Sequence, residues 1–226
     1  MIEMQDIQKT YHTSGVDTPV LHDVSLSIDE GEFVALMGPS GTGKSTLMNI
    51  FGLLDRPSAG SYKLAGQDLT ALDDRGLSVI RNRRIGFVFQ LFHLLPRISV
   101  LQNVLLPFLY TTPYPPDAKD RAADLLRMVG LEDRMDFKPN ALSGGQQQRV
   151  AIARAMVNEP AILLADEPTG NLDSTATEEI LDIFSKLHKQ GRTIVMVTHE
   201  PDVAACASRV ITLKDGRIDT DERRPQ

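Results

Sequence analysis

The stretch Gly38-Pro39-Ser40-Gly41-Thr42-Gly43-Lys44-Ser45 decides the fold class of this 226-residue chain. It matches the pattern G-x-x-x-x-G-K-[ST], follows the apolar run 33–37 and precedes the helix-like segment 46–50. Glycines let consecutive backbone N–H groups turn toward an anion, and a helix N-terminus adds partial positive charge. The stretch therefore predicts a phosphate-binding loop between a strand and a helix. The alternative is an ordinary glycine turn before a helix.

The loop residues are the first candidate site. We expect Lys44 to reach the β- and γ-phosphates of a nucleotide and the Ser45 hydroxyl to bind Mg²⁺. The candidate nucleotide-binding residues here are Gly38, Pro39, Ser40, Gly41, Thr42, Gly43, Lys44, Ser45 and Thr46.

Strand and helix patterns alternate along much of the chain. The stretch 24–28 alternates between apolar and polar residues, which is typical of an antiparallel strand with one wet face. Helical patterns separate the apolar runs and include 174–190, with Asp173 or Ser174 as N-cap and Gly191 as the stop. Strands that alternate with helices predict crossovers and a mainly parallel sheet. The predicted buried strands are 33–37, 85–89, 161–165, 193–197 and 210–213.

The block from about 91 to 155 has a different pattern. Its helical periodicity is interrupted by the proline-rich loop 112–116, so it predicts a mostly helical insertion into an α/β core. The tail 221–226 is expected to be frayed.

Composition excludes several classes of protein. The chain has 24 basic and 30 acidic side chains and a net charge of −6, which argues against a wide basic surface for nucleic acid. The single cysteine, Cys206, cannot form an internal disulfide. We find neither a membrane-spanning apolar run nor a secretory signal, and therefore expect a cytosolic chain that reaches a membrane only through a partner.

Two adjacent acids follow the apolar run 162–165. Asp166 and Glu167 should lie at the carboxyl end of this strand, where open α/β sheets bind ligands. Asp166 can hold Mg²⁺ through water, and Glu167 can polarise the water that attacks the γ-phosphate. A solvated strand end is the alternative, but the phosphate loop upstream favours the catalytic interpretation.

The stretch Leu142-Ser143-Gly144-Gly145-Gln146 opens a second helix. It predicts a second anion-binding N-terminus, in which Ser143, Gly145 and Gln146 are candidate nucleotide contacts. Two copies paired head-to-tail would explain this spare site, because each copy would close over the ATP of the other. The alternative is an ordinary N-capped helix.

With these motifs, the chain resembles the nucleotide-binding subunit of ATP-binding-cassette (ABC) transporters. Residues 38–45 resemble Walker A, 162–167 resemble Walker B, and 142–146 resemble the family signature. The resemblance implies a RecA-like P-loop NTPase core with a parallel sheet, an antiparallel β edge subdomain and an inserted helical subdomain. The expected layout is a single domain, 1–226, with its core in 1–90 and 156–226 and the helical subdomain in about 91–155.

The resemblance also implies roles for further residues. Gln90 is similar to the Q-loop glutamine that senses Mg²⁺ and the attacking water, and 171–173 is similar to the D-loop. His199 is similar to the switch histidine, and Tyr11 to the aromatic residue that stacks on adenine. Tyr11 could instead simply close the β-rich edge. The implied cofactors are ATP and Mg²⁺. The implied catalytic residues are Glu167, His199, Gln90 and Lys44, and the implied metal ligands are Ser45, Gln90 and Asp166.

Two segments resemble the lipoprotein-release and macrolide-export branch: the Q-loop region, 89–96 with 100–107, and the segment 167–173. Gln102 departs from the glutamate expected there. The apolar residues of 91–109 predict a groove for a helix of a membrane permease, contacted through about 86–110, or else they pack the core of the helical insertion. Those residues are Leu91, Phe92, Leu94, Leu95, Leu105 and Phe108.

The resemblance predicts a homodimeric ATPase that drives permease subunits from the cytoplasmic face of the inner or plasma membrane. One alternative is a cell-division type of ATPase that signals across the membrane without transporting a cargo. A DNA-repair or translation cassette is disfavoured, because the chain lacks coiled coils, zinc modules, a strongly basic surface and a second cassette.

Overall fold

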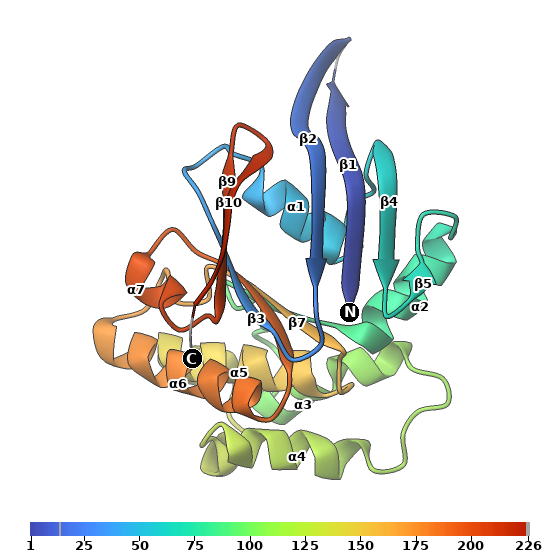
Figure 1. The fold of residues 1–226 in the computed structure, drawn as a ribbon. Helices are drawn as coiled ribbons and strands as arrows, with labels where there is room; N and C mark the ends of the chain where they lie inside the picture. The colour runs from blue at the N-terminus through green and yellow to red at the C-terminus, as the bar shows by residue number, and fades with distance from the viewer. Residues whose placement is uncertain (14, 225–226) are drawn as a thin grey trace. The chain divides into compact units, whose positions relative to one another are not determined.

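The computed structural model describes residues 1–13 and 15–224 (Figure 1). The chain divides into two units. The first unit contains residues 1–79 and 191–226, and the second contains residues 80–190. Both units mix strands with helices, as predicted for an α/β fold.

The N-terminal part of the first unit is an antiparallel sheet. Its strands are β1 (Ile2–Thr13), β2 (Val16–Ile28), β4 (Ala59–Leu64) and β5 (Gln67–Asp68), in the order β2-β1-β4-β5. Ile2 pairs with Ile28, and both are fully buried because alternate residues of the paired strands face the core. The predicted strand 24–28 is confirmed as the end of β2.

The second sheet region of this unit has the order β10-β9-β3-β8. The strands β3 (Phe33–Met37), β8 (Thr193–Val197) and β9 (Arg209–Lys214) run parallel, and β10 (Arg217–Arg223) is antiparallel to β9. All five residues of β8 are buried, as expected for a strand that is covered on both faces. The helices are α1 (Lys44–Phe51) and α7 (Pro201–Ala204), and α2 (Asp74–Arg84) runs from this unit into the next.

The frayed tail was a wrong expectation for residues 221–223. These residues belong to β10, where the carboxylate of Asp221 accepts two hydrogen bonds, of 2.7 and 2.6 Å, from the buried Arg209. The backbone N–H of Arg224 also donates to the oxygen of Ser208 at 2.8 Å. Strand pairing between β9 and β10 and the ion pair of Arg209 with Asp221 therefore hold this end in the sheet. Residues 225–226 lie outside the described residues.

The second unit contains two parallel strands and several helices. The strands β6 (Ile85–Phe89) and β7 (Ile162–Asp166) pair so that Phe89 lies opposite Asp166. The longest helix is α6 (Ser174–Lys189), which the sequence predicted, and the Asp173 side chain caps it by accepting a bond from the N–H of Ala176. The other elements are α3 (Val100–Leu105), η1 (Leu106–Tyr110), α4 (Ala118–Met128), η2 (Glu132–Arg134), η3 (Pro139–Ala141) and α5 (Gly144–Met156).

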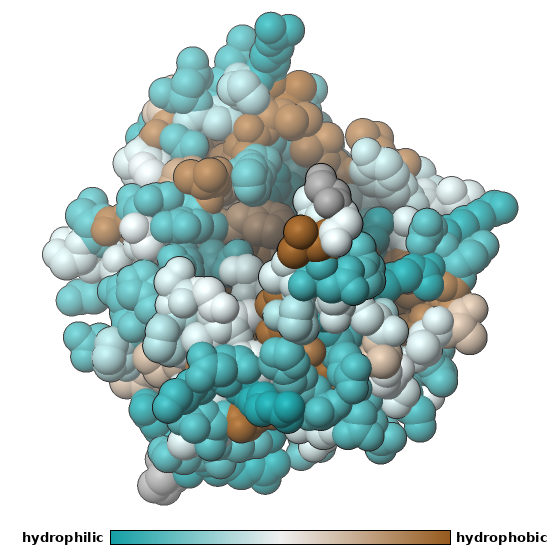
Figure 2. Space-filling view, turned by 90° about the horizontal axis from the view of Figure 1, so that it is seen from above, coloured by the Kyte–Doolittle hydropathy of each residue, from teal (hydrophilic) through white to brown (hydrophobic). Residues whose placement is uncertain are grey.

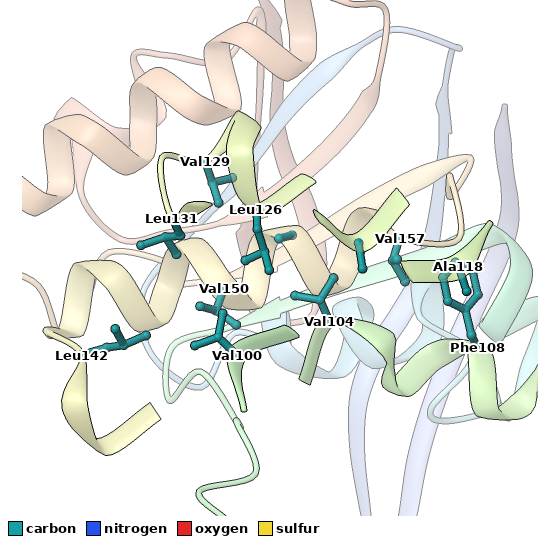
Figure 3. Packing of buried hydrophobic residues seen from close by; sticks show 12 residues of the cluster. Val100, Val104, Phe108, Ala118, Leu126, Val129, Leu131, Leu142, Val150 and Val157 are labelled. Atoms are coloured by element: carbon teal, nitrogen blue, oxygen red, sulfur yellow. The ribbon is translucent and has the colours of Figure 1, made fainter. Parts of the chain in front are cut away.

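Aliphatic side chains from α3, α4 and α5 form the helical core of this unit, and Phe108 joins them (Figure 3). The ring of Phe108 is 1% exposed and is covered by the Arg121 guanidinium at 5.2 Å, so Phe108 packs the core and does not line a surface groove. Leu94 and Leu105 are partly buried against the same cluster. Leu91 and Leu95, by contrast, are 67% and 49% exposed. The core alternative is thus confirmed for Phe108 and in part for Leu94 and Leu105, whereas the groove for a permease helix stays a prediction for the exposed residues.

Hydrophilic residues cover most of the face in Figure 2, and hydrophobic residues form separate groups on it. In the part of the chain that the structure describes, none of the helices has the length and apolar character needed to cross a membrane.

Candidate functional site

The phosphate loop requires its glycines for steric reasons. Gly38, Gly41 and Gly43 all have positive φ, at 140°, 82° and 98°. A Cβ on Gly38 would lie 2.2 Å from the main-chain oxygen of Leu213, and one on Gly43 would lie 2.7 Å from Cδ2 of Leu21. Neither position can hold another residue without moving its neighbours.

Lys44 is folded over the loop. Its Nζ donates to the main-chain oxygens of Gly38 at 2.7 Å and Pro39 at 2.8 Å, and the residue is 8% exposed. An ammonium group has three donors, so one remains for a phosphate oxygen. The helix α1 begins without a side-chain cap after Gly43, which suits the binding of an anion at its first turn. Ser45 is exposed at this end of the helix.

The β1–β2 hairpin borders the phosphate loop. Leu21, which touches Gly43, pairs with Lys9, and Tyr11 lies two residues further along β1, opposite Thr18. The Tyr11 residue is 36% exposed. The predicted base-stacking residue therefore lies on the hairpin that contacts the phosphate loop, within the same unit.

His199 follows the end of β8. The preceding Thr198 donates its backbone N–H to the oxygen of Leu36 at 3.2 Å, two residues before the loop begins at Gly38. His199 is exposed at this carboxyl edge of the parallel strands. It thus shares an edge with the phosphate loop.

The second unit brings Gln90, Asp166 and Glu167 together. Gln90 and Glu167 directly follow the paired residues Phe89 and Asp166, so both leave the same edge of two parallel strands. Glu167 has a φ of 43°, a left-handed conformation that costs free energy for a side chain of this kind. Such strained positions are concentrated at functional sites.

Two residues of the segment after Glu167 contact Gln90. The Nδ2 of Asn171 donates to the main-chain oxygen of Gln90 at 3.2 Å. A Cβ on Gly170 would lie 2.7 Å from Nε2 of Gln90, so the glutamine side chain packs on this glycine. The predicted Q-loop and D-loop therefore meet within one unit.

Ser143 caps α5 through a capping box with Gln146. The Ser143 oxygen accepts from the Gln146 N–H at 3.3 Å, and the Gln146 side chain accepts from the Ser143 N–H at 3.0 Å. Gly145 is buried, and a Cβ on it would lie 2.8 Å from the Cβ of Ala176 in α6. Helix packing alone thus explains Gly145, whereas Ser143 is exposed.

Two residues of α5 with structural roles near the site are not part of any predicted motif. Gln148 is fully buried and donates to the main-chain oxygens of Pro168 and Phe89, and Arg154 donates to those of Phe92 and His93. Burial lowers the pKa of Arg154. The signal that could have revealed Gln148 is its place on the apolar stripe of α5, with the buried Ala151, Ile152 and Ala155 three, four and seven residues later.

The predicted metal ligands supply oxygen atoms. Ser45, Gln90 and Asp166 offer a hydroxyl, an amide oxygen and a carboxylate, a donor set that suits Mg²⁺. Within residues 1–13 and 15–224, no three His, Cys, Asp or Glu side chains are grouped closely enough to hold a metal. In Mg²⁺ sites one or two carboxylates commonly act together with substrate phosphates and water.

Comparison with known proteins decides the family. The sequence profile described as "ABC transporter" matches residues 21–170. The chain belongs to the ABC transporter family. It is 52% identical over 223 residues to the uncharacterized ABC transporter ATP-binding protein YvrO of Bacillus subtilis, covering 99% of this chain and 97% of that protein.

Two further similarities extend this result. The macrolide export ATP-binding/permease protein MacB of Syntrophobacter fumaroxidans is 52% identical, covering 97% of this chain but 31% of MacB. A dimeric post-hydrolysis structure of the ATP-binding cassette MJ0796, bound to ADP and Pi, has a TM-score of 0.90 at 44% identity and covers both chains completely. The chain is therefore an ABC transporter ATPase subunit with the P-loop cassette fold, as predicted. The roles of the individual site residues stay predictions.

Proposed function

We propose that this subunit binds ATP on residues 38–46, with Tyr11 on the adenine, and hydrolyses it within a pair of identical subunits. The observation that carries the proposal is the phosphate loop, in which three glycines with positive φ open the backbone and Lys44 retains a free donor. A loop of this geometry before a helix N-terminus selects a phosphate group.

The proposed chemistry is positioning and electrostatic stabilisation. Backbone N–H groups of the loop and the Lys44 ammonium stabilise the charge that spreads over the γ-phosphoryl oxygens. Glu167 accepts a proton from the attacking water, Gln90 orients that water, and His199 donates to the γ-phosphate. In this proposal the nucleophile approaches in line with the leaving oxygen.

Ser45, Gln90 and Asp166 are the proposed ligands of Mg²⁺. When bound, this ion would neutralise part of the phosphate charge. These three residues would supply only some of the oxygen ligands, because Mg²⁺ in proteins usually keeps several water ligands.

We infer the pairing of two subunits from the exposed Ser143 and from MJ0796, which is described as dimeric and bound to ADP and Pi. Ser143 and Gly145–Gln146 begin α5, whose N-terminus can approach the γ-phosphate held by a second copy. The full-length similarity to the dimeric MJ0796 supports the pairing, and a head-to-tail arrangement would let each subunit complete the site of the other.

We also infer a membrane permease as partner, contacted through about 86–110. MacB is described as an ATP-binding/permease protein, and this chain matches about a third of its length. Leu91, Leu95, Leu109 and Tyr110 are exposed apolar side chains in this region and suit contact with a permease helix. The subunit would then act at the cytoplasmic face of the membrane. The net charge of −6 argues against nucleic acid as the partner.

The substitution Glu167→Gln tests this function. It should leave ATP binding intact, lower turnover by about 100-fold or more through loss of the general base, and accumulate the ATP-bound dimer in light scattering. Glu178→Gln, on the exposed side of α6, is the matched control and should hydrolyse ATP normally. Unchanged turnover in Glu167→Gln would contradict the assignment.

Ser143→Arg tests the shared site separately. The variant should lose hydrolysis and dimer formation while the single subunit keeps its affinity for ATP, because Ser143 acts on the nucleotide of the other copy. Loss of that affinity would contradict the shared arrangement.

A further inference from the structure

Tyr11 belongs to a connected group of side chains that the sequence motifs do not include. Its hydroxyl donates to Oδ2 of Asp55 at 2.8 Å. The other carboxylate oxygen of Asp55 accepts from Nζ of Lys9 at 2.6 Å, and Nζ also donates to the main-chain oxygen of Arg56 at 2.8 Å. One carboxylate thus holds a tyrosine and a lysine at the same time.

Lys9 also covers the tyrosine ring. The two residues lie two positions apart on β1 and share a face of that strand, and Nζ of Lys9 lies 4.7 Å from the centroid of the Tyr11 ring. Lys9 is only 9% exposed, so its ammonium depends on these partners for stabilisation. One face of the ring is therefore occupied and its hydroxyl end is fixed.

Asp55 is suited to hold both groups as an anion. Burial alone would raise the pKa of Asp55, but hydrogen bonds from Lys9, Tyr11 and the Arg56 N–H lower the pKa below its ordinary value. The carboxylate is accordingly ionised at neutral pH and accepts the two side-chain bonds at once.

The location of this group links it to the phosphate loop. Lys9 pairs across the hairpin with Leu21, and Leu21 packs on Gly43 of the phosphate loop. A ring that is already held in place on this hairpin loses little conformational freedom when a flat group stacks on it.

We propose that Asp55 and Lys9 are positioning residues for the nucleobase: they hold the Tyr11 ring so that its remaining face receives the purine of ATP. This inference rests on the proposed binding of ATP. In this proposal the Asp55 carboxylate, 44 residues along the chain from the Tyr11 ring, contributes to recognition of the base. It does not contribute to recognition of the phosphates.

The test compares two ligands in the full-length chain, with Glu167→Gln in every variant to block turnover. Asp55→Ala should weaken ATP binding by about three- to tenfold, because it removes the bonds to both Tyr11 and Lys9, and should leave the affinity for inorganic triphosphate unchanged. If Asp55 only stabilised the fold as a whole, Asp55→Ala would lower the affinity for ATP and the affinity for triphosphate together. Asp55→Asn, which keeps the shape and one acceptor, should lie between Asp55→Ala and the parent in ATP affinity.

A double-mutant cycle shows whether Asp55 acts through the ring. Tyr11→Ala should weaken ATP binding, and adding Asp55→Ala to it should cause no further loss. Asp17→Ala is the matched control, since Asp17 is an exposed carboxylate on the same hairpin that pairs with His12, and it should bind ATP like the parent. Additive losses from Tyr11→Ala and Asp55→Ala, or an equal loss of triphosphate affinity, would overturn the inference.

Failure of the inference can be distinguished from failure of the proposed function. If the parent binds ATP and triphosphate but Asp55→Ala changes neither, only the positioning role fails. If the parent binds neither ligand, the proposed nucleotide site fails and the positioning role fails with it.

Discussion

The Nε2 atom of Gln148 donates a hydrogen bond of 2.6 Å to the main-chain oxygen of Pro168. It also donates to the oxygen of Phe89 at 3.3 Å. Phe89 directly precedes Gln90, and Pro168 directly follows Glu167, so one fully buried side chain joins the two segments proposed for hydrolysis. Because both acceptors are carbonyl oxygens, only the nitrogen of this amide can face them.

Gln148→Met should therefore slow hydrolysis. Methionine keeps the approximate volume but donates no hydrogen bond, so the segments that carry Gln90 and Glu167 lose their common support. We expect kcat to fall by about tenfold with little change in ATP affinity, since the phosphate loop keeps its own glycines and the Lys44 contacts. Steady-state kinetics and equilibrium ATP binding measure the two effects.

The control for this variant is Gln190→Met, at the exposed end of α6, which should behave like the parent chain. Thermal unfolding of Gln148→Met must show a folded protein at the assay temperature. A loss of ATP affinity as large as the loss of kcat would contradict a positioning role for Gln148.

Arg154 supports the segment that follows Gln90. Its guanidinium donates to the main-chain oxygens of His93 at 2.6 Å and Phe92 at 2.7 Å, and both of these residues have left-handed backbones. Arg154→Met removes both bonds, so this strained segment should open more often. We expect amide hydrogen exchange in residues 91–96 to accelerate by about tenfold, as measured by mass spectrometry.

Arg154→Lys should only partly restore this protection, because an ammonium group lacks the planar fork that reaches two adjacent carbonyls. Arg127→Met is the matched control on α4, where the half-exposed arginine pairs with Asp124. If the rates of amide hydrogen exchange in residues 91–96 were the same in Arg154→Met and Arg127→Met, Arg154 would not hold this segment.

Gly145→Ala should destabilise the fold through the contact between α5 and α6. The new Cβ would lie 2.8 Å from the Cβ of Ala176, so we expect the free energy of unfolding to fall by about 1–3 kcal/mol in urea titrations. Gly144→Ala is the paired comparison and should cost less, since its new Cβ would meet the movable Cδ2 of Leu172 at 3.3 Å and Cζ of Phe92 at 3.8 Å, both side-chain atoms.

Adding Ala176→Gly removes the close contact, and in that background Gly145→Ala should cost much less free energy. An equal cost in both backgrounds would mean that packing against α6 does not explain the glycine.

Local patterns predicted the phosphate loop, the helix 174–190 and the buried strands. The glycines of the loop and the Asp173 cap act on neighbours within a few residues, so the sequence shows them directly. The start of β1 was harder to predict. Ile2, Met4 and Ile7 are buried there, but a register shift between Met4 and Ile7 breaks the two-residue period that predicts a strand.

Contacts between distant residues could not be predicted. Asp55 meets Tyr11 only because β1 and the segment before β4 are brought together, and Gln148 meets Phe89 59 residues away. Phe108 shows the same limit: an apolar residue in the segment 91–109 suits either a core or a docking surface, and only the turn of η1 decides for the core.

Asp221 makes the stability of β10 dependent on pH. Hydrogen bonds from Arg209 lower the pKa of Asp221, and partial burial opposes this only in part. A carboxylate whose pKa is lower in the folded state stabilises the fold above its ordinary pKa of 3.8, and the contribution is lost as the pH falls below 3.8. Asp221→Asn should thus cost about 1–2 kcal/mol at pH 7 and progressively less toward pH 2–3, as measured by urea unfolding.

Asp219→Asn, on the same strand with an exposed side chain, should cost little at either pH. Glu32 still accepts a bond from Arg209 at 3.0 Å in the Asp221→Asn variant, which keeps the guanidinium paired and limits the loss. If the difference between Asp221→Asn and the parent were to grow as the pH falls, the Arg209 pair could not be the source of this stability.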